Sequence, residues 1–369
     1  MQKTLQKVEQ AVVDNANTDH RAHLGMSQLG IECLRSLWYT FRWCSPHHYV
    51  SRVLRLFDRG QLEEKRFNKL LKDAGIEVWD IDPDTGEQWR VSDVSGHLGG
   101  SLDGVLLGVC EDPDTPHVSE QKTHNDRSFK DLQKKGVEQS KPVHWAQMQL
   151  YMHKMGLTHA LYQAVNKNDD DLYYEQVTLD ESAAQALIER GKRVITSSEP
   201  LPKISDDAAF FKCKFCDHRP LCHLTATPEA NCRTCVHSTP EMDGDGRWHC
   251  ERHSKDLTTQ DQREGCQYHL MIPPLLETWA EPKDSDYQSV TYNNRLTGNE
   301  FSNGKGGYSS QEIAACQSVE IIGNPIAPIA CIEFILTIAV INLFNKSSDM
   351  FIVSFISLFV IITLLLIYK

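Results

Sequence analysis

The sequence has no surplus of basic residues. Its 369 residues include 38 Lys and Arg against 50 Asp and Glu, so the formal net charge is −12 and the pI is near 5.7. This balance excludes a general attraction to phosphate, and any contact with a phosphate backbone must come from a local group of cations. Arg127, Lys130, Lys134, Lys135 and Lys141 form one such group. The same pattern is also typical of a solvated helix face.

The chain also lacks a secretory signal at its start, because residues 1–20 contain no apolar core of the kind that such signals need. We therefore expect a reducing compartment, the cytoplasm, where clustered cysteines bind metal more often than they form disulfides. Cysteine itself is abundant. Seven of the twelve cysteines fall between Cys213 and Cys266, and this clustering needs a chemical explanation.

The periodicity of apolar residues predicts helices, then strands, then further helices. A helical pattern covers residues 31–74, and Gly75 suits its end. Strands are expected at 76–81, 87–94, 101–109, 116–123, 159–167 and 172–179, and helices at 126–136, 142–156 and 180–195. The turn-forming segment EDPDTP between two of these strands predicts an antiparallel hairpin. This order predicts an α/β fold with a central mixed sheet flanked by helices.

Two carboxylates are predicted to meet at one edge of this sheet. Asp103 opens one strand of the hairpin, and Glu120 ends the other. Lys122 would face the same way as Glu120, because side chains alternate along a strand. Such carboxylates can hold a metal ion that polarises a phosphoryl oxygen and activates a water molecule. The lysine could then orient that water, and the backbone carbonyl of Gln121 could supply a further oxygen ligand.

The segments GGSLDGV and SEQKT resemble the D…(D/E)xK signature of the PD-(D/E)XK nucleases, in their RecB-like and phage-exonuclease branch. Upstream, Gly60-x-x-x-Glu64 is similar to the first motif of that family. Downstream, WAQMQLYM is similar to its Q-x-x-x-Y helix motif, with Gln147 and Tyr151 one turn apart. The resemblance covers roughly residues 24–222 and implies a restriction-endonuclease-like core that hydrolyses DNA.

This resemblance implies a role for each matching residue. Mg²⁺ or Mn²⁺ would be held by Glu64, Asp103, Glu120 and Gln121, Lys122 would act on the water, and Gln147 and Tyr151 would place the substrate strand. Exonuclease action in phage-type recombination or replication, with DNA and a phage recombination or replication protein as partners, follows only from the resemblance.

Two positions have competitors. Pro113-Asp114 followed by Glu120 is the literal string of the family name, but the EDPDTP cluster predicts a turn far from the strand edge. We therefore prefer Asp103 to Asp114. Glu63 competes in the same way with Glu64.

Cys213, Cys216 and Cys222 form a C-x2-C-x5-C motif that needs a fourth ligand, and Cys33 is the candidate. One distant cysteine followed by this motif resembles the iron-sulfur staple of AddB-type helicase-nucleases and of CRISPR-adaptation exonucleases. The resemblance implies a 4Fe-4S cluster that ties the two ends of the domain together. Zinc on the same four thiolates is the alternative.

Four later cysteines, Cys232, Cys235, Cys250 and Cys266, suit a small structural zinc site, because thiolate ligands favour tetrahedral zinc and so short a segment can bury little core. His269 is an alternative to the fourth cysteine. Free, reduced cysteines are the other interpretation.

The last part of the chain is apolar. Residues 326–344 and 350–368 are each long enough for a membrane-spanning helix. We expect this tail either to tether the protein to a membrane or to be a foreign fragment joined to it. The expected domains are an N-terminal tail (1–24), the nuclease domain with its staple (25–224), a zinc-like module (225–278), a polar extension (279–325) and a transmembrane hairpin (326–369).

Two other functions remain open from the sequence. The first is a non-catalytic DNA-binding protein that keeps the nuclease fold and the metal clusters. The second is a membrane protein whose remaining part is an interaction domain.

Overall fold

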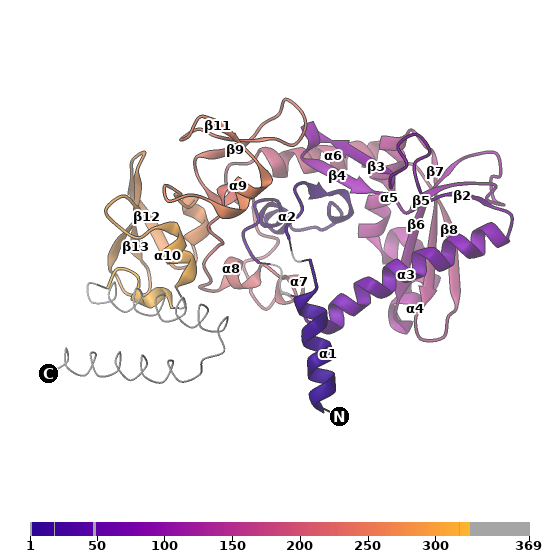
Figure 1. Cartoon of the computed structure of the whole chain (residues 1–369), viewed down its shortest axis with the longest axis horizontal. Coiled ribbons are helices and arrows are strands. Elements are labelled where there is room, and N and C mark those ends of the chain that lie inside the picture. Colours follow the sequence, from indigo (N-terminus) through magenta and orange to yellow (C-terminus); the bar gives the residue numbers. More distant parts are fainter. Residues whose placement is uncertain (1, 18, 47–48, 317, 325–369) are drawn as a thin grey trace, which may run out of the picture. The chain divides into compact units, whose positions relative to one another are not determined.

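The computed structural model describes residues 2–17, 19–46, 49–316 and 318–324 (Figure 1). The chain divides into two compact units, Met1–Thr278 and Trp279–Lys369. The predicted membrane hairpin at 326–369 lies outside the described residues. Across the described ranges, none of the helices combines the length and the apolar character that crossing a bilayer demands.

A five-stranded mixed sheet forms the centre of the larger unit. Its order is β2 (Glu77–Trp79), β5 (Gly104–Leu107), β6 (His117–His124), β7 (His159–Asn166) and β8 (Leu172–Thr178). β5 and β6 are antiparallel, whereas β6 and β7 are parallel. Parallel neighbours need a long crossover, which α4 (Asp126–Ser140) and α5 (Pro142–Met155) supply. The predicted α/β fold with a central mixed sheet is confirmed.

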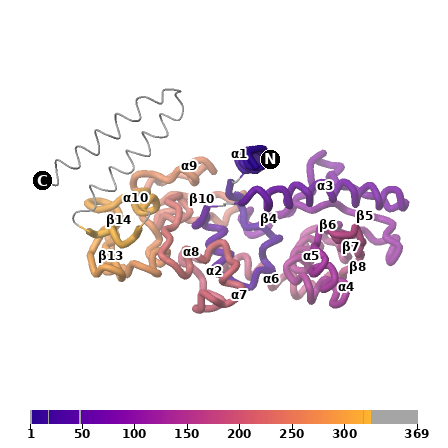
Figure 2. The backbone as a smooth tube through the Cα atoms, turned by 90° about the horizontal axis from the view of Figure 1, so that it is seen from below, coloured from indigo at the N-terminus to yellow at the C-terminus, as the bar shows by residue number. Residues whose placement is uncertain are grey.

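Helices cover both faces of this sheet. Figure 2 shows α3 (Ser51–Asp73) along one side and α4 and α5 on the other. Residues 146–152 of α5 are all buried, because the sheet lies on one side of α5 and α6 (Glu181–Thr196) packs on the other. α5 is therefore the inner helix of the unit, and its side chains have fixed neighbours.

A smaller three-stranded sheet has the order β1 (Leu24–Gly25), β4 (Leu98–Ser101) and β3 (Arg90–Asp93). The expected strand 101–109 is therefore divided between two sheets, since β4 ends at Ser101 and β5 begins at Gly104. Asp103 lies in the link between them.

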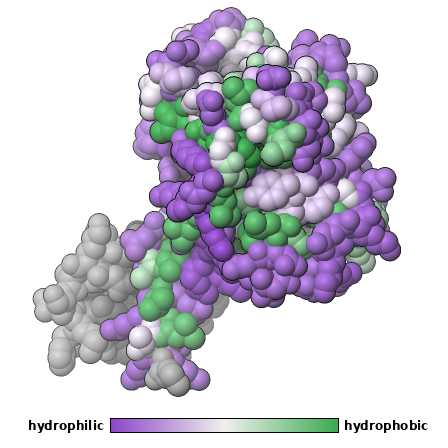
Figure 3. Space-filling model, turned by 90° about the vertical axis from the view of Figure 1, so that its right-hand side faces the viewer, coloured by the Kyte–Doolittle hydropathy of each residue, from purple (hydrophilic) through white to green (hydrophobic). Residues whose placement is uncertain are grey.

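The N-terminal segments also differ from expectation. The helical pattern of 31–74 is interrupted and forms two helices, α2 (Leu34–Phe41) and α3. The expected tail contains α1 (Gln2–Asp14), in which no residue is buried. Leu5 and Val8 are 57% and 50% exposed, and Figure 3 shows apolar side chains open along this downward-pointing helix.

The cysteine-rich segment 225–278 belongs to the larger unit and shares its core. It contains α9 (Thr259–Glu264) and a small sheet of β9 (Ser238–Pro240), β10 (Trp248–Cys250) and β11 (Lys255–Leu257). Before it come two short helices, α7 (Phe211–Lys214) and α8 (Arg219–His223).

A buried arginine joins this segment to the N-terminal part of the unit. The guanidinium of Arg233 lies 3.7 Å from the ring centroid of Trp43 and 4.6 Å from that of Trp248. It also donates hydrogen bonds to the carbonyls of Phe41 (2.9 Å) and Ala22 (2.7 Å). A buried cation needs such acceptors, so the segment is docked on its neighbour by specific polar contacts as well as by apolar area.

The smaller unit is a meander of β12 (Ala280–Ser285), β13 (Ser289–Asn294) and β14 (Glu300–Gly304), followed by α10 (Ser310–Ala315). Its core includes a stack of aromatic rings, in which the Phe301 centroid lies 5.5 Å from Trp279 and 5.1 Å from Tyr292. The side chains of Ser309 and Glu312 cap α10 reciprocally.

Candidate active site

Asp103, Glu120 and Lys122 come together where the link from the smaller sheet enters the larger one. Asp103 Oδ2 accepts a hydrogen bond of 2.8 Å from the backbone N–H of Gln121. Glu120 is fully buried and forms an ion pair with the ammonium of Lys122, whose side chain is 27% exposed. The pair therefore has a buried carboxylate and a lysine that reaches toward solvent.

The expected position of Glu120 at the end of its strand was wrong. β6 continues to His124, because its parallel pairing with β7 extends from His117 opposite His159 to His124 opposite Asn166. Glu120 thus lies in the middle of a central strand, which explains its complete burial.

α5 places two of the predicted residues behind Glu120. Gln147 Nε2 donates a hydrogen bond of 3.0 Å to Glu120 Oε2 and one of 3.3 Å to the hydroxyl of Tyr151. Gln147 is 7% exposed and Tyr151 is 2% exposed. A role of these two residues in placing a substrate strand stays a prediction. In this structure Gln147 faces Glu120, because the sheet covers that side of α5.

The pKa values of Glu120 and Glu64 are both raised. Burial raises the pKa of Glu120 to about 7, and the charges of Asp103 and Glu64 add to this effect while Lys122 opposes it. Burial and then Asp103 also raise the pKa of Glu64. Burial alone would lower the pKa of Lys122, but Glu120 and Asp103 raise it above the ordinary lysine value. Three carboxylates thus share one electrostatic environment with a single ammonium group.

In the part of the chain that the structure describes, no three His, Cys, Asp or Glu side chains are placed to hold a metal ion. The chemistry of the donor set nevertheless fits one. Glu64, Asp103 and Glu120 offer carboxylate oxygens, which Mg²⁺ and Mn²⁺ prefer as ligands, and a divalent cation would offset their mutual repulsion.

A cleft of about 1020 Å³ lies beside this group, although Asp103 and Glu120 are not among its lining residues. Glu64, Gln121 and Lys122 line it, and so does Glu63. Glu63 lies 3.6 Å from Arg66, whereas Glu64 interacts with Asp103 and Lys122, which favours Glu64 as the site residue. The competitor Asp114 is exposed in the turn between β5 and β6.

His124 and His144 also line this cleft, and neither was predicted as a site residue. The Tyr162 hydroxyl lies 2.9 Å from His124 Nε2 and 2.8 Å from His144 Nδ1. Burial and then nearby lysine charges lower the pKa of His124 to about 4 and that of His144 to about 3. Both imidazoles are therefore neutral near pH 7. Side chains alternate along a strand, so His124 faces the same way as Glu120 and Lys122. This alternation in the sequence could have identified His124 as a residue of the site.

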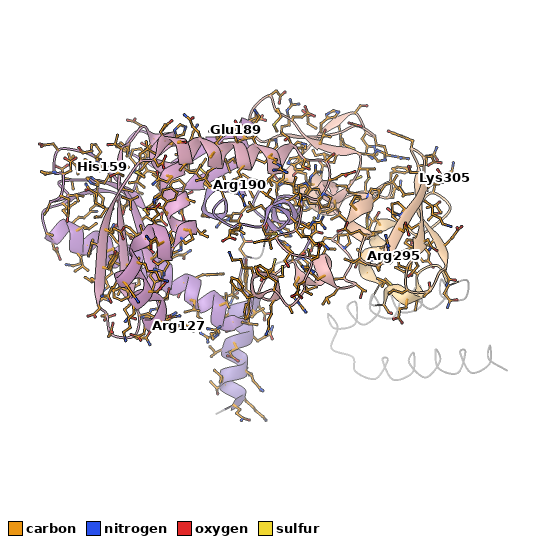
Figure 4. The ribbon with its side chains drawn as sticks, turned by 180° about the vertical axis from the view of Figure 1, so that it is seen from behind. Arg127, His159, Glu189, Arg190, Arg295 and Lys305 are labelled. Atoms are coloured by element: carbon orange, nitrogen blue, oxygen red, sulfur yellow. The ribbon has the colours of Figure 1, made fainter. Side chains whose placement is uncertain are left out.

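The predicted basic group lies beside the cleft. A second cavity, of about 640 Å³, shares Ser128 and Lys141 with the first and is also lined by Arg127 and Lys134. Figure 4 shows Arg127 beside one end of the larger sheet and His159 at the opposite end. Because β7 begins at His159 and runs parallel to β6, the cations gather where both strands end.

The four cysteines of the predicted staple line one cavity of about 610 Å³. Burial raises the pKa of Cys222 to about 11, and the charges of Cys33 and Cys216 contribute to this rise. Burial also raises the pKa of Cys213, and the thiols of Cys33 and Cys216 contribute to this rise. Cys33 thus lies near the C-x2-C-x5-C motif, although the two are far apart in the sequence.

The second set of cysteines also lines one cavity, of about 440 Å³, together with His269. Burial raises the pKa of Cys232 to about 12, and Cys235, Cys266 and Cys250 add to it in that order. Burial lowers the pKa of His269 to about 4, and its Nε2 lies 2.8 Å from the carbonyl of Asn231.

No family model matches the chain, and no curated protein sequence matches it. Among solved structures, the chain is similar to LHK-Exo, an alkaline exonuclease from Laribacter hongkongensis, at 15% identity and a TM-score of 0.35. It is also similar to LHK-Exo in complex with dAMP, at 14% identity and a TM-score of 0.36. Each of these alignments covers 51% of this chain and 90% of the other. SSO0001 is similar at 12% identity and a TM-score of 0.36, over 59% of this chain and 96% of the other. The similarity is distant and concerns the fold.

Proposed function

We propose that this chain is a metal-dependent DNA nuclease that hydrolyses phosphodiester bonds at Asp103, Glu120 and Lys122. The observation that supports this most strongly is the electrostatic coupling of three carboxylates and one lysine beside a cleft whose neighbouring cavity is basic. An exonuclease of phage-type recombination or replication is the more specific form of the proposal, and it rests on the sequence resemblance.

Each residue of the group has a task in this proposal. Glu64, Asp103, Glu120 and the carbonyl of Gln121 would hold Mg²⁺ or Mn²⁺, which when bound polarises a phosphoryl oxygen and lowers the pKa of water. Lys122 is the partly exposed member, so its ammonium can donate to an oxygen in the cleft. Gln147 fixes the orientation of Glu120 through the hydrogen bond to Oε2.

The test is cleavage of end-labelled linear DNA and closed circular DNA by the full chain, with Mg²⁺, with Mn²⁺ or without either. We expect Asp103→Asn and Lys122→Ala to abolish cleavage. Asp114→Asn is the matched control, because Asp114 is an exposed turn residue, and it should retain activity. Loss of the linear substrate alone would indicate an exonuclease. A folded chain that binds DNA and cuts neither substrate would instead be the non-catalytic DNA-binding protein.

We also propose two metal sites on the cysteines. Cys33, Cys213, Cys216 and Cys222 would hold a 4Fe-4S cluster, with Zn²⁺ as the alternative, and Cys232, Cys235, Cys250 and Cys266 would hold a structural Zn²⁺. The shared cavities support this, and so does the electrostatic effect of the thiols on one another, which requires that they lie close together. The thiols would lose their protons when the metal binds. Visible absorbance and metal analysis of the purified chain distinguish iron from zinc.

The cytoplasmic location and the membrane tether at 326–369 stay predictions. Fractionation of cells that express the full chain tests both. Recovery of the protein with the membrane fraction after a high-salt wash would support the tether.

A further inference from the structure

Two phenylalanines at α7 lie open to solvent. Phe211 is 60% exposed and Phe215 is 80% exposed, so both rings are accessible to a ligand or a partner. Cations accompany both rings. The Lys212 ammonium lies 5.5 Å from the Phe211 ring centroid, and the Lys214 ammonium lies 5.8 Å from that of Phe215. Two lysines therefore lie between the two rings in the sequence, one beside each ring.

The local fold holds these rings outward. Cys213 lies between them and is buried, and the backbone N–H of Cys216 donates a hydrogen bond of 3.1 Å to the carbonyl of Cys213. With the buried thiol directed inward, the flanking rings are presented on the opposite side. Rings held in this way lose little conformational freedom when a ligand binds.

The platform formed by Phe211 and Phe215 continues the candidate active-site cleft. Both rings line the 610 Å³ cavity, and Gln28, Thr40 and Tyr49 line this cavity and the cleft alike. A strand bound in the cleft at Lys122 can therefore extend along this lining to the two rings.

The charge around the platform suits a polyanion. Four cationic side chains line its cavity, Arg35, Lys203, Lys212 and Arg219. Two anionic side chains, Glu32 and Asp217, line the same cavity. Lys212 is paired with Glu32, and Arg35 and Lys203 both lie beside Glu277, so these carboxylates offset part of the positive charge. The remaining positive charge, to which Lys214 adds, would attract phosphates.

We propose that Phe211 and Phe215 form a stacking platform for single-stranded nucleic acid that is bound in the active-site cleft. The exposed rings can stack on bases while the lysines beside them meet phosphates, and only unpaired bases offer both faces for stacking. An apolar peptide could cover the rings but would make no use of the lysines beside them. The proposal deepens the proposed function and rests on it, because it names the form of substrate that the same cleft receives.

The test measures binding of a fluorescent oligothymidylate to the full chain by anisotropy, without added divalent metal. We expect Phe215→Ala to weaken binding about tenfold, which is the effect of losing one stacked base. Phe215→Leu keeps the apolar bulk but not the aromatic face and should weaken binding similarly, whereas Phe215→Tyr should bind like the wild type. Leu172→Ala is the control, since Leu172 is 46% exposed on β8 and should leave binding unchanged.

A second measurement separates this inference from the proposed function. The same variants are assayed on a nitrophenyl ester of thymidine monophosphate, which is too short to reach the platform, with Mg²⁺ or Mn²⁺. Cleavage of this ester together with binding that does not depend on Phe215 would overturn the platform alone. Binding that depends on Phe215 without cleavage would overturn the nuclease and leave the platform. A leucine variant that binds as tightly as the wild type would also overturn the platform, because stacking would then not be the interaction.

Discussion

Gly30 provides a direct test of how α5 is held against the active site. An ideal Cβ at this position would lie 2.6 Å from the Cα of Val143, 3.1 Å from the Cβ of Ala146 and 3.2 Å from the carbonyl oxygen of Pro142. Since the shortest of these contacts is to backbone, a side-chain rotation cannot relieve it. The substitution Gly30→Ala would therefore displace the first turn of α5.

The displacement has two expected effects. Forcing an extra methyl group into a packed interface costs about 1–3 kcal/mol of unfolding free energy. α5 also carries Gln147, whose hydrogen bond to Glu120 is 3.0 Å long. Because a shift of about 1 Å at a catalytic group can cost roughly a hundredfold in rate, we expect kcat for DNA cleavage to fall by about tenfold to a hundredfold.

Gly60→Ala is the matched control for stability. Gly60 lies in α3, and no described atom lies within 4 Å of an added Cβ there. The same chemical change should stabilise the protein by about 0.5–1 kcal/mol, because alanine restricts the unfolded chain and favours the helix.

Urea denaturation of the full chain and of both variants measures these changes, with cleavage assays on the same samples. The two substitutions should shift the unfolding midpoint in opposite directions. A Gly30→Ala protein as stable as the wild type would refute the packing argument. A destabilised protein with unchanged cleavage would refute the link from α5 to Glu120.

Three further predictions concern other parts of the larger unit. Gly100→Ala would place a Cβ 2.6 Å from the Tyr151 hydroxyl and should cost about 1–3 kcal/mol; an unchanged urea midpoint would contradict this. Burial lowers the pKa of His144 to about 3, so the unfolded chain takes up its proton first as the pH falls below about 6.5. The contribution of the neutral His144 to the free energy of unfolding is therefore full above about pH 6.5 and is lost as the pH falls from about 6.5 to 3. Because the glutamine of His144→Gln does not titrate, the urea midpoint of this variant should depend less on pH than that of the wild type. Cys250→Ser should lower the metal content and the melting temperature, whereas Cys110→Ser, at an exposed position, should change neither; equal metal content in both variants would argue against the zinc site.

Local patterns in the sequence predicted the strands and helices between residues 116 and 195 and part of the site. The turn between β5 and β6 brings Asp103 close to Glu120, and strand alternation places Lys122 with them. These relations depend on residues near one another in the chain, so short-range geometry determines them. The C-x2-C spacings are local in the same sense.

Other features depend on contacts between distant segments. The parallel pairing of β6 with β7 buries Glu120 in the middle of a strand, and the packing of α5 between the sheet and α6 turns Gln147 toward that carboxylate. Both depend on the crossover through α4 and α5, which apolar periodicity does not specify.

The sequence by itself thus determined which residue types carry the chemistry and which elements they occupy. Only the tertiary structure decided that Cys33 shares a cavity with Cys213, and that Arg233 lies buried against Trp43. The physical reason is that side-chain periodicity encodes which face of an element is buried, whereas the identity of its neighbour follows from the packing of the whole unit.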